Sequence, residues 1–322
     1  MRKGSSRRGV SEVEREYDAR LGVRGKYLDA AGARLNQDEP LHVWAPIFAF
    51  RWKGQECALP HNSWIHDFVA VKRHIDSQEA KFYLSEEERE RCRHTRHWLH
   101  LTHARGAEPS PRARMNTFLL GLWLIRPTQA HVGLRLDVAE SRVRTIHRVL
   151  DRFQWIPGQA SDEIFDGDLR DLPALLVPME EIYIAKRRLH NALVLTFRGC
   201  VSVDWQSAFI CFAAAAESLL TYSSRPGLTK RLAESYGALV DTAIQPTSGV
   251  SRVDFGRFYS IRSDIVHGRA FGRADQQRNL EDLRSFSDLL RGLWRVILES
   301  DTIRRALEED DHHRESFFKA LV

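Results

Sequence analysis

The chain of 322 residues has 48 lysines and arginines against 43 aspartates and glutamates, a formal net charge of +5, and 43% of its residues are hydrophobic. This composition excludes an intrinsically disordered chain, and 19 glycines are far too few for a collagen-like one. Four cysteines without a close pair exclude a disulfide scaffold and predict reduced thiols. The length predicts about two domains.

Residues 1–40 are rich in charge and glycine, which predicts a charged N-terminal arm with one short helix over Glu12–Leu21. The basic start is not followed by an apolar stretch, so no secretory signal is expected. The longest apolar runs, Phe118–Ile125 and Ala208–Ala216, are shorter than the roughly 20 residues of a membrane helix. We therefore expect a cytoplasmic protein without membrane contact.

Residues 41–175 are predicted to form a mixed α/β domain of unknown role. The segment Leu41–Trp52 is aromatic and β-rich, and Pro46 within it indicates an edge strand or a break. Ser85 is expected to cap a helix that has acids in its first turn. Ser110 and the proline after it predict a second helix that ends at about residue 125.

The rest of this domain is predicted from periodicity and from turn-forming residues. Residues 131–136 are expected to form a short strand and Asp137–Phe153 a helix. The prolines, glycines and aspartates between residues 157 and 173 predict a connecting loop.

Residues 176–322 are predicted to form an all-α helical bundle with short loops. Gly199 is expected to end the first helix. The expected helices are Met179–Phe197, Asp204–Tyr222, Thr229–Val240, Val253–His267, Gln276–Ser300 and Thr302–Leu321. The predicted fold class is therefore α+β, with a mixed N-terminal domain followed by helices.

One row of histidines raises the question of a metal: His94, His97, His100 and His103. On a helix only adjacent members of this row would share a face, so the four cannot converge on one ion. A two-histidine fragment that borrows ligands from His61, His66 or Cys92 is one interpretation. A solvated surface segment is the other, and we expect no metal and no other cofactor.

A histidine follows an arginine at a distance of five residues in four places: Arg89/His94, Arg126/His131, Arg142/His147 and Arg262/His267. With 14 histidines and an arginine-rich chain, the spacing alone carries little weight. The last pair stands out because Phe255, Phe258 and Tyr259 continue a helical repeat into it and Gly268 follows as a helix stop. A histidine at a helix end is suited to acid–base chemistry.

The same segment is locally basic. Residues 252–278 contain six arginines and three aspartates. Arg257, Arg269 and Arg273 are therefore candidate phosphate-binding residues. The alternative is structural, with His267 capping the last carbonyl groups of the helix beside a solvated arginine.

Three segments that occur in order resemble the HEPN superfamily, and specifically its ApeA-like branch: Trp205–Leu220, Leu228–Glu234 and Tyr259–Gly268. The resemblance covers about residues 178–300. It implies a helical bundle and a metal-independent endoribonuclease that acts as a homodimer with a composite active site. Antiviral (phage) defence or toxin-like growth arrest is the implied setting.

The resemblance also implies residue roles. His267 would act as general base or acid on the 2′-hydroxyl or the leaving 5′-oxygen, and Arg262 would hold the scissile phosphate. The polar residues Ser263 and Asp264 would orient the histidine. Supporting positions on other helices are Glu217 and Arg231, which would form a charge pair if they meet. The rival interpretations are a non-catalytic RNA- or nucleotide-binding module, and a dimerisation protein whose N-terminal domain is a sensor.

Overall fold

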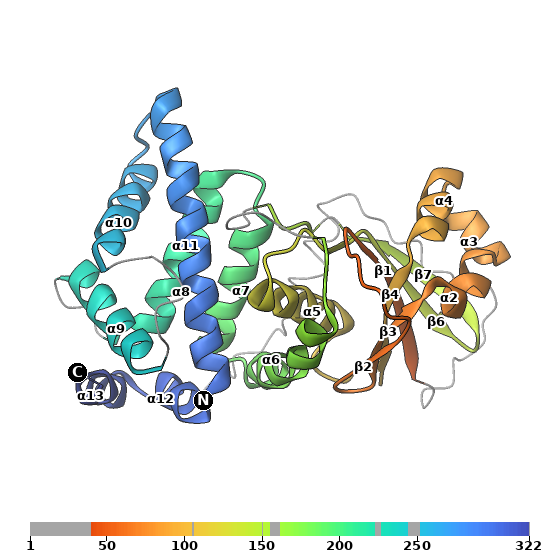
Figure 1. Cartoon of the computed structure of the whole chain (residues 1–322), viewed down its shortest axis with the longest axis horizontal. Helices are drawn as coiled ribbons and strands as arrows, with labels where there is room; N and C mark the ends of the chain where they lie inside the picture. Colours follow the sequence, from red (N-terminus) through yellow and green to blue (C-terminus); the bar gives the residue numbers. More distant parts are fainter. Residues whose placement is uncertain are drawn as a thin grey trace, which may run out of the picture.

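A computed structural model describes residues 40–104, 106–149, 151–154, 162–222, 227–243 and 252–321. Apart from Pro40, the predicted arm and its helix over Glu12–Leu21 lie outside the described residues. An antiparallel sheet occupies one end of the molecule and a group of helices the other, as Figure 1 shows. Between them lie α5 (Pro111–Ile125) and α6 (Asp166–Ala185). The prediction of an α+β protein is confirmed at this level.

The seven-stranded sheet has the strand order β2-β3-β4-β1-β6-β7, and β5 pairs with the end of β1. Every strand pair is antiparallel. The strands are β1 (Leu41–Phe48), β2 (Cys57–Leu59), β3 (Ser63–Asp67), β4 (His97–His103), β5 (His131–Val132), β6 (Leu134–Ala139) and β7 (Arg142–Arg148).

Pro46 lies in β1, which is a central strand, so the expectation of an edge strand is wrong. On one side of β1, Pro46 is opposite Trp98 of β4. On the other side, β6 pairs with His42–Trp44 and β5 pairs with Ile47 and Phe48. The ladder on that side is therefore interrupted at Pro46. A residue without an N–H is tolerated where a ladder is broken.

Residues 134–148 form the β6–β7 hairpin, so the helix predicted over Asp137–Phe153 is wrong. Alternate residues of Leu134–Val138 enter one hydrophobic core, which is the period of a strand. Glu140 and Ser141 form the turn, with φ angles of 51° and 61°. Two left-handed residues in a two-residue turn match the right-handed twist of a hairpin, but Glu140 and Ser141 lack the glycine or asparagine that marks such a turn in a sequence.

Two predicted helix starts in the N-terminal region are confirmed. The Ser85 hydroxyl accepts the N–H of Glu88 at 3.1 Å, and the Glu88 carboxylate accepts the N–H of Ser85 at 2.9 Å. The Ser110 hydroxyl accepts the N–H of Ala113 at the start of α5. The helices beside the sheet are α2 (Phe68–Ile75), α3 (Gln78–Tyr83) and α4 (Glu86–His94).

Helix α6 begins inside the segment predicted as a loop, so that prediction is wrong. Pro173 and Pro178 lie within the helix, and each removes an intrahelical hydrogen bond. A row of buried leucines compensates by packing into the main core: Leu169, Leu172, Leu175 and Leu176. This core runs from the sheet through α5 and α6 into the bundle, and the predicted boundary at residues 175 and 176 falls inside α6.

The single helix predicted over Met179–Phe197 is two helices. Lys186 adopts a left-handed conformation, with φ of 52°, and separates α6 from α7 (Arg188–Val201). Gly199 lies inside α7 rather than at its end. A Cβ atom at Gly199 would lie 2.4 Å from the ring of Phe212 in α8 (Trp205–Leu220). The glycine therefore allows the two helices to approach closely.

Gly199→Ala is expected to destabilise the protein by about 1–3 kcal/mol, because the buried Phe212 ring has to move. Urea unfolding measures the change. Gly292→Ala in α11 (Arg273–Glu299) is the control: apart from the backbone of its own helix, no described atom lies within 4 Å of its added Cβ, and alanine should stabilise that helix by roughly 0.5–1 kcal/mol. A Gly199→Ala protein as stable as the parent would contradict the close packing.

The remaining helices follow the predicted order: α9 (Leu228–Ala243), α10 (Arg252–Val266), α11 (Arg273–Glu299), α12 (Asp301–Glu308) and α13 (Asp311–Ala320). The last predicted helix is split in two because the Asp310 carboxylate accepts the N–H groups of His312 and His313 and starts α13. Of the helices in the described residues, none is both long and apolar enough to cross a membrane.

Candidate functional site

The C-terminal end of α10 has the geometry of a Schellman motif. Gly268 has a φ of 71°, a left-handed conformation that glycine adopts without strain. The main-chain N–H of Gly268 donates to the carbonyl oxygen of Ile265 at 3.0 Å. The main-chain N–H of Arg269 donates to the main-chain carbonyl oxygen of Asp264 at 2.9 Å. The predicted stop at Gly268 is confirmed, and the helix ends one residue before His267.

The C-terminal end of α10 belongs to a helical hairpin, formed by α10 and α11, that projects from the bundle. The connection between α10 and α11 lies at the outer end of the two helices, beyond the other helices of the bundle (Figure 1). We call residues 262–273 the α10–α11 tip. The His267 side chain is exposed there, and the main-chain N–H of His267 donates to the carbonyl oxygen of Ser263 at 2.9 Å. A large ligand can therefore reach the histidine from solvent.

The Arg262 side chain contacts helix α8 through Glu217. Its Nη2 lies 3.8 Å from Oε1 of Glu217, and the arginine side chain remains 40% exposed. Glu217 Oε1 is buried and makes no hydrogen bond within the described residues. The contact orients the guanidinium without the close pairing of a bidentate ion pair. Of the two predicted supporting residues, Glu217 therefore contacts Arg262. The other, Arg231, lies part-buried on α9.

Tyr259 was not predicted as part of this group. Its hydroxyl donates to the carbonyl oxygen of Ala213 in α8 at 3.3 Å. Burial, followed by the neighbouring Glu217 carboxylate, raises the pKa of the Tyr259 hydroxyl. The tyrosine therefore stays protonated and fixes α10 on α8 beside the ion pair. Its position three residues before Arg262 on one helix face is the sequence signal that could have identified it.

The acid in the tip does not pair with Arg262. Asp264 lies 2.7 Å from Nη1 of Arg269, and the two are also joined by a main-chain hydrogen bond. Ser263 is part-buried, and its carbonyl oxygen accepts the main-chain N–H of His267. Asp264 therefore leaves the Arg262 charge available to a ligand.

The three candidate phosphate-binding arginines are in different settings. Arg257 points to α11, where its Nη2 lies 2.7 Å from Oδ2 of the largely buried Asp282. Arg269 pairs with Asp264 as described. Arg273 is exposed in the first turn of α11. Arg262 and Arg273 are thus the cations of the tip best placed to meet an anion.

The histidine row lies mainly on a strand, so its interpretation as a helix is wrong. His94 is the last residue of α4 and contacts Glu90 at 3.1 Å, whereas the other three belong to β4. Alternation along β4 places His97 and His103 on one face of the sheet and His100 on the other. Within the described residues, no group of three or more metal-ligating side chains could hold an ion.

His100 belongs to a cluster on the sheet. Its Nε2 lies 3.1 Å from Nδ1 of His42, and its ring stacks on Trp44 with a centroid distance of 4.0 Å. Burial, followed by the neighbouring histidines, lowers the pKa of His100 to about 3. Burial, followed by Arg73, lowers the pKa of His74 to about 4. Both rings are therefore neutral in the folded protein above pH 5.

Acid is expected to destabilise this sheet. In the unfolded chain, His74 and His100 take up a proton near pH 6.5, whereas in the folded protein they stay neutral to a much lower pH. The free energy of unfolding therefore decreases as the pH falls from about 6.5 to 4, by about 1.4 kcal/mol per pH unit for each ring. Urea unfolding of the parent and of His74→Leu at pH 7.5 and 5.0 measures the slope, which should be smaller in the variant. Exposed His94→Leu is the control, and equal slopes in the parent and His74→Leu would contradict the account.

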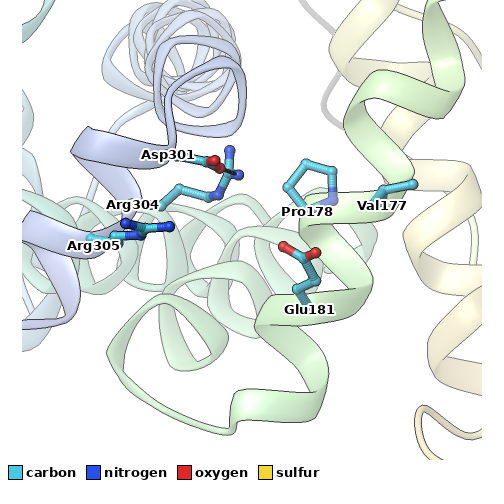
Figure 2. A pocket seen from close by; sticks show the side chains of 6 residues that line it. All are labelled: Val177, Pro178, Glu181, Asp301, Arg304 and Arg305. Atoms are coloured by element: carbon cyan, nitrogen blue, oxygen red, sulfur yellow. Dashed lines mark hydrogen bonds and ion pairs between the residues drawn. The ribbon is translucent and has the colours of Figure 1, made fainter.

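A concave region lies between α6 and α12, away from the tip. Its volume is about 440 Å³, and its lining residues are Val177, Pro178, Glu181, Asp301, Arg304 and Arg305. Figure 2 shows the acid of α6 and the arginines of α12 on opposite sides of the opening. Arg304 already pairs with Asp301 and donates to a main-chain carbonyl. The charges of this region are balanced, so it has no preference for a polyanion.

No known protein family, no curated protein and no solved structure matches this chain.

Proposed function

We propose that this chain is a metal-independent endoribonuclease of the HEPN type, with its active site at the α10–α11 tip. The observation that carries the proposal is the exposed His267, which directly follows a helix that ends in a Schellman motif, on the same segment as Arg262. Glu217 orients this arginine at 3.8 Å without enclosing it. An exposed base and an exposed, oriented cation on one segment are the groups that general acid–base attack on a phosphodiester needs.

In this reaction His267 takes the proton of a ribose 2′-hydroxyl, and the 2′-oxygen forms a bond to phosphorus. The bond from phosphorus to the 5′-oxygen breaks, and an imidazolium returns a proton to that oxygen. The products are a 2′,3′-cyclic phosphate and a 5′-hydroxyl. Arg262 stabilises the charge that develops on the phosphate oxygens. DNA lacks the nucleophile, so RNA is the substrate class.

A homodimer with a composite active site completes this scheme. Residues five apart on a helix are separated by about 140° around its axis, so one protomer presents Arg262 and His267 in different directions. Two copies packed tip to tip would supply one histidine as base and the other as acid. The setting that we propose is a cytoplasmic defence or growth-arrest protein.

A non-catalytic RNA- or nucleotide-binding module is the second candidate. It is favoured by the geometry of one protomer, because residues five apart on a helix are separated by about 140° around its axis and a single tip does not bring Arg262 and His267 to one phosphate. In that case Arg262 and His267 only contact a phosphate.

Purified protein incubated with total RNA in EDTA separates the candidates. Cleavage that persists in EDTA supports the nuclease. Binding without cleavage in a filter or mobility assay supports the second candidate. A dimer that neither binds nor cleaves RNA supports a purely structural or sensor protein.

A further inference from the structure

Three aromatic side chains form a row across adjacent strands of the sheet. His100 of β4 lies between Trp44 of β1, at a centroid distance of 4.0 Å, and Trp64 of β3, at 5.4 Å. The interplanar angles are 9° and 27°, so all three rings are close to parallel. We call Trp44, His100 and Trp64 the aromatic row.

The two ends of the aromatic row differ. At the inner end the strand register places the buried Leu136 of β6 opposite Trp44. At the outer end the register places Ala58 of the edge strand β2 opposite Trp64. Residues directly opposite each other in an antiparallel pair project to the same face, so among the described strands the residue beside Trp64 on that side contributes only a methyl group. Ala58 is exposed and Trp64 is partly exposed.

Polar groups flank this outer end. His66, two residues after Trp64 on β3, lies 3.4 Å from Oε1 of Glu56, whose side chain is 63% exposed. A carboxylate at the edge of the row can accept hydrogen bonds from the amino group of a ring stacked on Trp64. Arg73 lies toward the other, inner end, because its Nε donates to the His74 ring, which contacts Trp44.

We propose that the outer end of the aromatic row binds an unpaired base of single-stranded RNA, stacked on Trp64 over Ala58. A flat heterocycle extends a row of parallel rings, and the Glu56 carboxylate can meet its amino edge. Stacking of this kind is tolerant of sequence because every base has a π face. The inference shares its ligand class with the proposed function, but it does not need the tip to be catalytic.

The test measures the affinity of the full chain for a fluorescein-labelled oligoadenylate by anisotropy in EDTA, in a His267→Ala background that keeps the probe intact. Ala58→Leu fills the space beside Trp64 and is expected to weaken binding about tenfold or more. Ala58→Ser is the matched control and should leave the affinity within twofold. Trp64→Phe keeps a ring and should bind far better than Trp64→Leu.

An abasic oligomer of equal length identifies the moiety that is bound: it should bind more weakly, and Ala58→Leu should not change its affinity. Equal affinity of Ala58→Leu and Ala58→Ser for oligoadenylate would overturn the proposal, as would equal binding of the abasic oligomer. Thermal unfolding shows whether each variant is folded. If His267→Ala abolishes cleavage but Ala58→Leu leaves the RNA affinity unchanged, the stacking site is refuted and the nuclease is not. If His267→Ala still cleaves RNA but Ala58→Leu weakens RNA binding, the nuclease is refuted and the stacking site is not.

Discussion

His267→Ala is expected to lower the rate of RNA cleavage by about a hundredfold or more, because a positioned general acid–base contributes roughly 10²–10⁴ to such a rate. Arg262→Met should cause a loss of about the same size, because the charge developing on phosphate would lose its oriented cation. Arg262→Lys keeps the charge but loses the planar fork, so it should recover only part of the activity. Initial rates on a labelled RNA, measured in EDTA, give these values.

The chain contains a matched control for this prediction. His94 also follows an arginine at a distance of five residues, and it also lies exposed at the end of a helix, α4. His94→Ala should therefore cleave RNA at the parental rate. A His267→Ala protein as active as the parent, or an equal loss in both variants, would place the chemistry elsewhere.

Arg114→Met is expected to destabilise the folded protein by about 3–5 kcal/mol, because it removes the buried partner of Glu180 and leaves this acid only the partly exposed His61 at 3.6 Å. Arg114 of α5 lies 3.4 Å from Glu180 of α6, and both side chains are less than a tenth exposed. The guanidinium also donates to the carbonyl oxygen of Thr102 at 2.9 Å and to the hydroxyl of Ser63 at 2.6 Å. This one side chain therefore connects the sheet to both central helices. Urea unfolding measures the loss.

Two comparisons test that explanation. Arg112 is on the same helix but its side chain is 58% exposed, so Arg112→Met should change stability by less than about 0.5 kcal/mol. Burial raises the pKa of the Glu180 carboxyl, and Arg114 opposes this. Without the arginine the carboxyl should protonate at a higher pH, so the loss in Arg114→Met should shrink as the pH is lowered from 8 to 5. A loss that is constant with pH would contradict the buried charge.

Local signals in the sequence predicted what local chemistry controls. Ser85 and Ser110 were recognisable as caps because their hydroxyls bond to N–H groups three residues away. Gly268 was recognisable as a stop because only the local backbone determines its left-handed conformation. Prediction failed where distant contacts decide, as in α6, where the burial of leucines outweighs two prolines.

The same distinction applies to the candidate site. The spacing of Arg262 and His267 and the helix end between them follow from one segment of the sequence. The contact of Arg262 with Glu217, and the anchoring of Tyr259 on Ala213, depend on how α10 packs on α8. The aromatic row depends on the register of three strands, in which Trp44 and Trp64 both lie opposite His100. A single sequence does not reveal that register.

The chemical nature of the RNA ends produced in EDTA tests the proposed activity most directly. The account predicts 2′,3′-cyclic phosphate and 5′-hydroxyl ends from the parent protein, and no cleavage at a position where one 2′-deoxynucleotide replaces the ribonucleotide. The same ends should be missing with His267→Ala. Ends that carry a 5′-phosphate, or cleavage that continues at the 2′-deoxy position, would contradict an attack by the 2′-hydroxyl at this site.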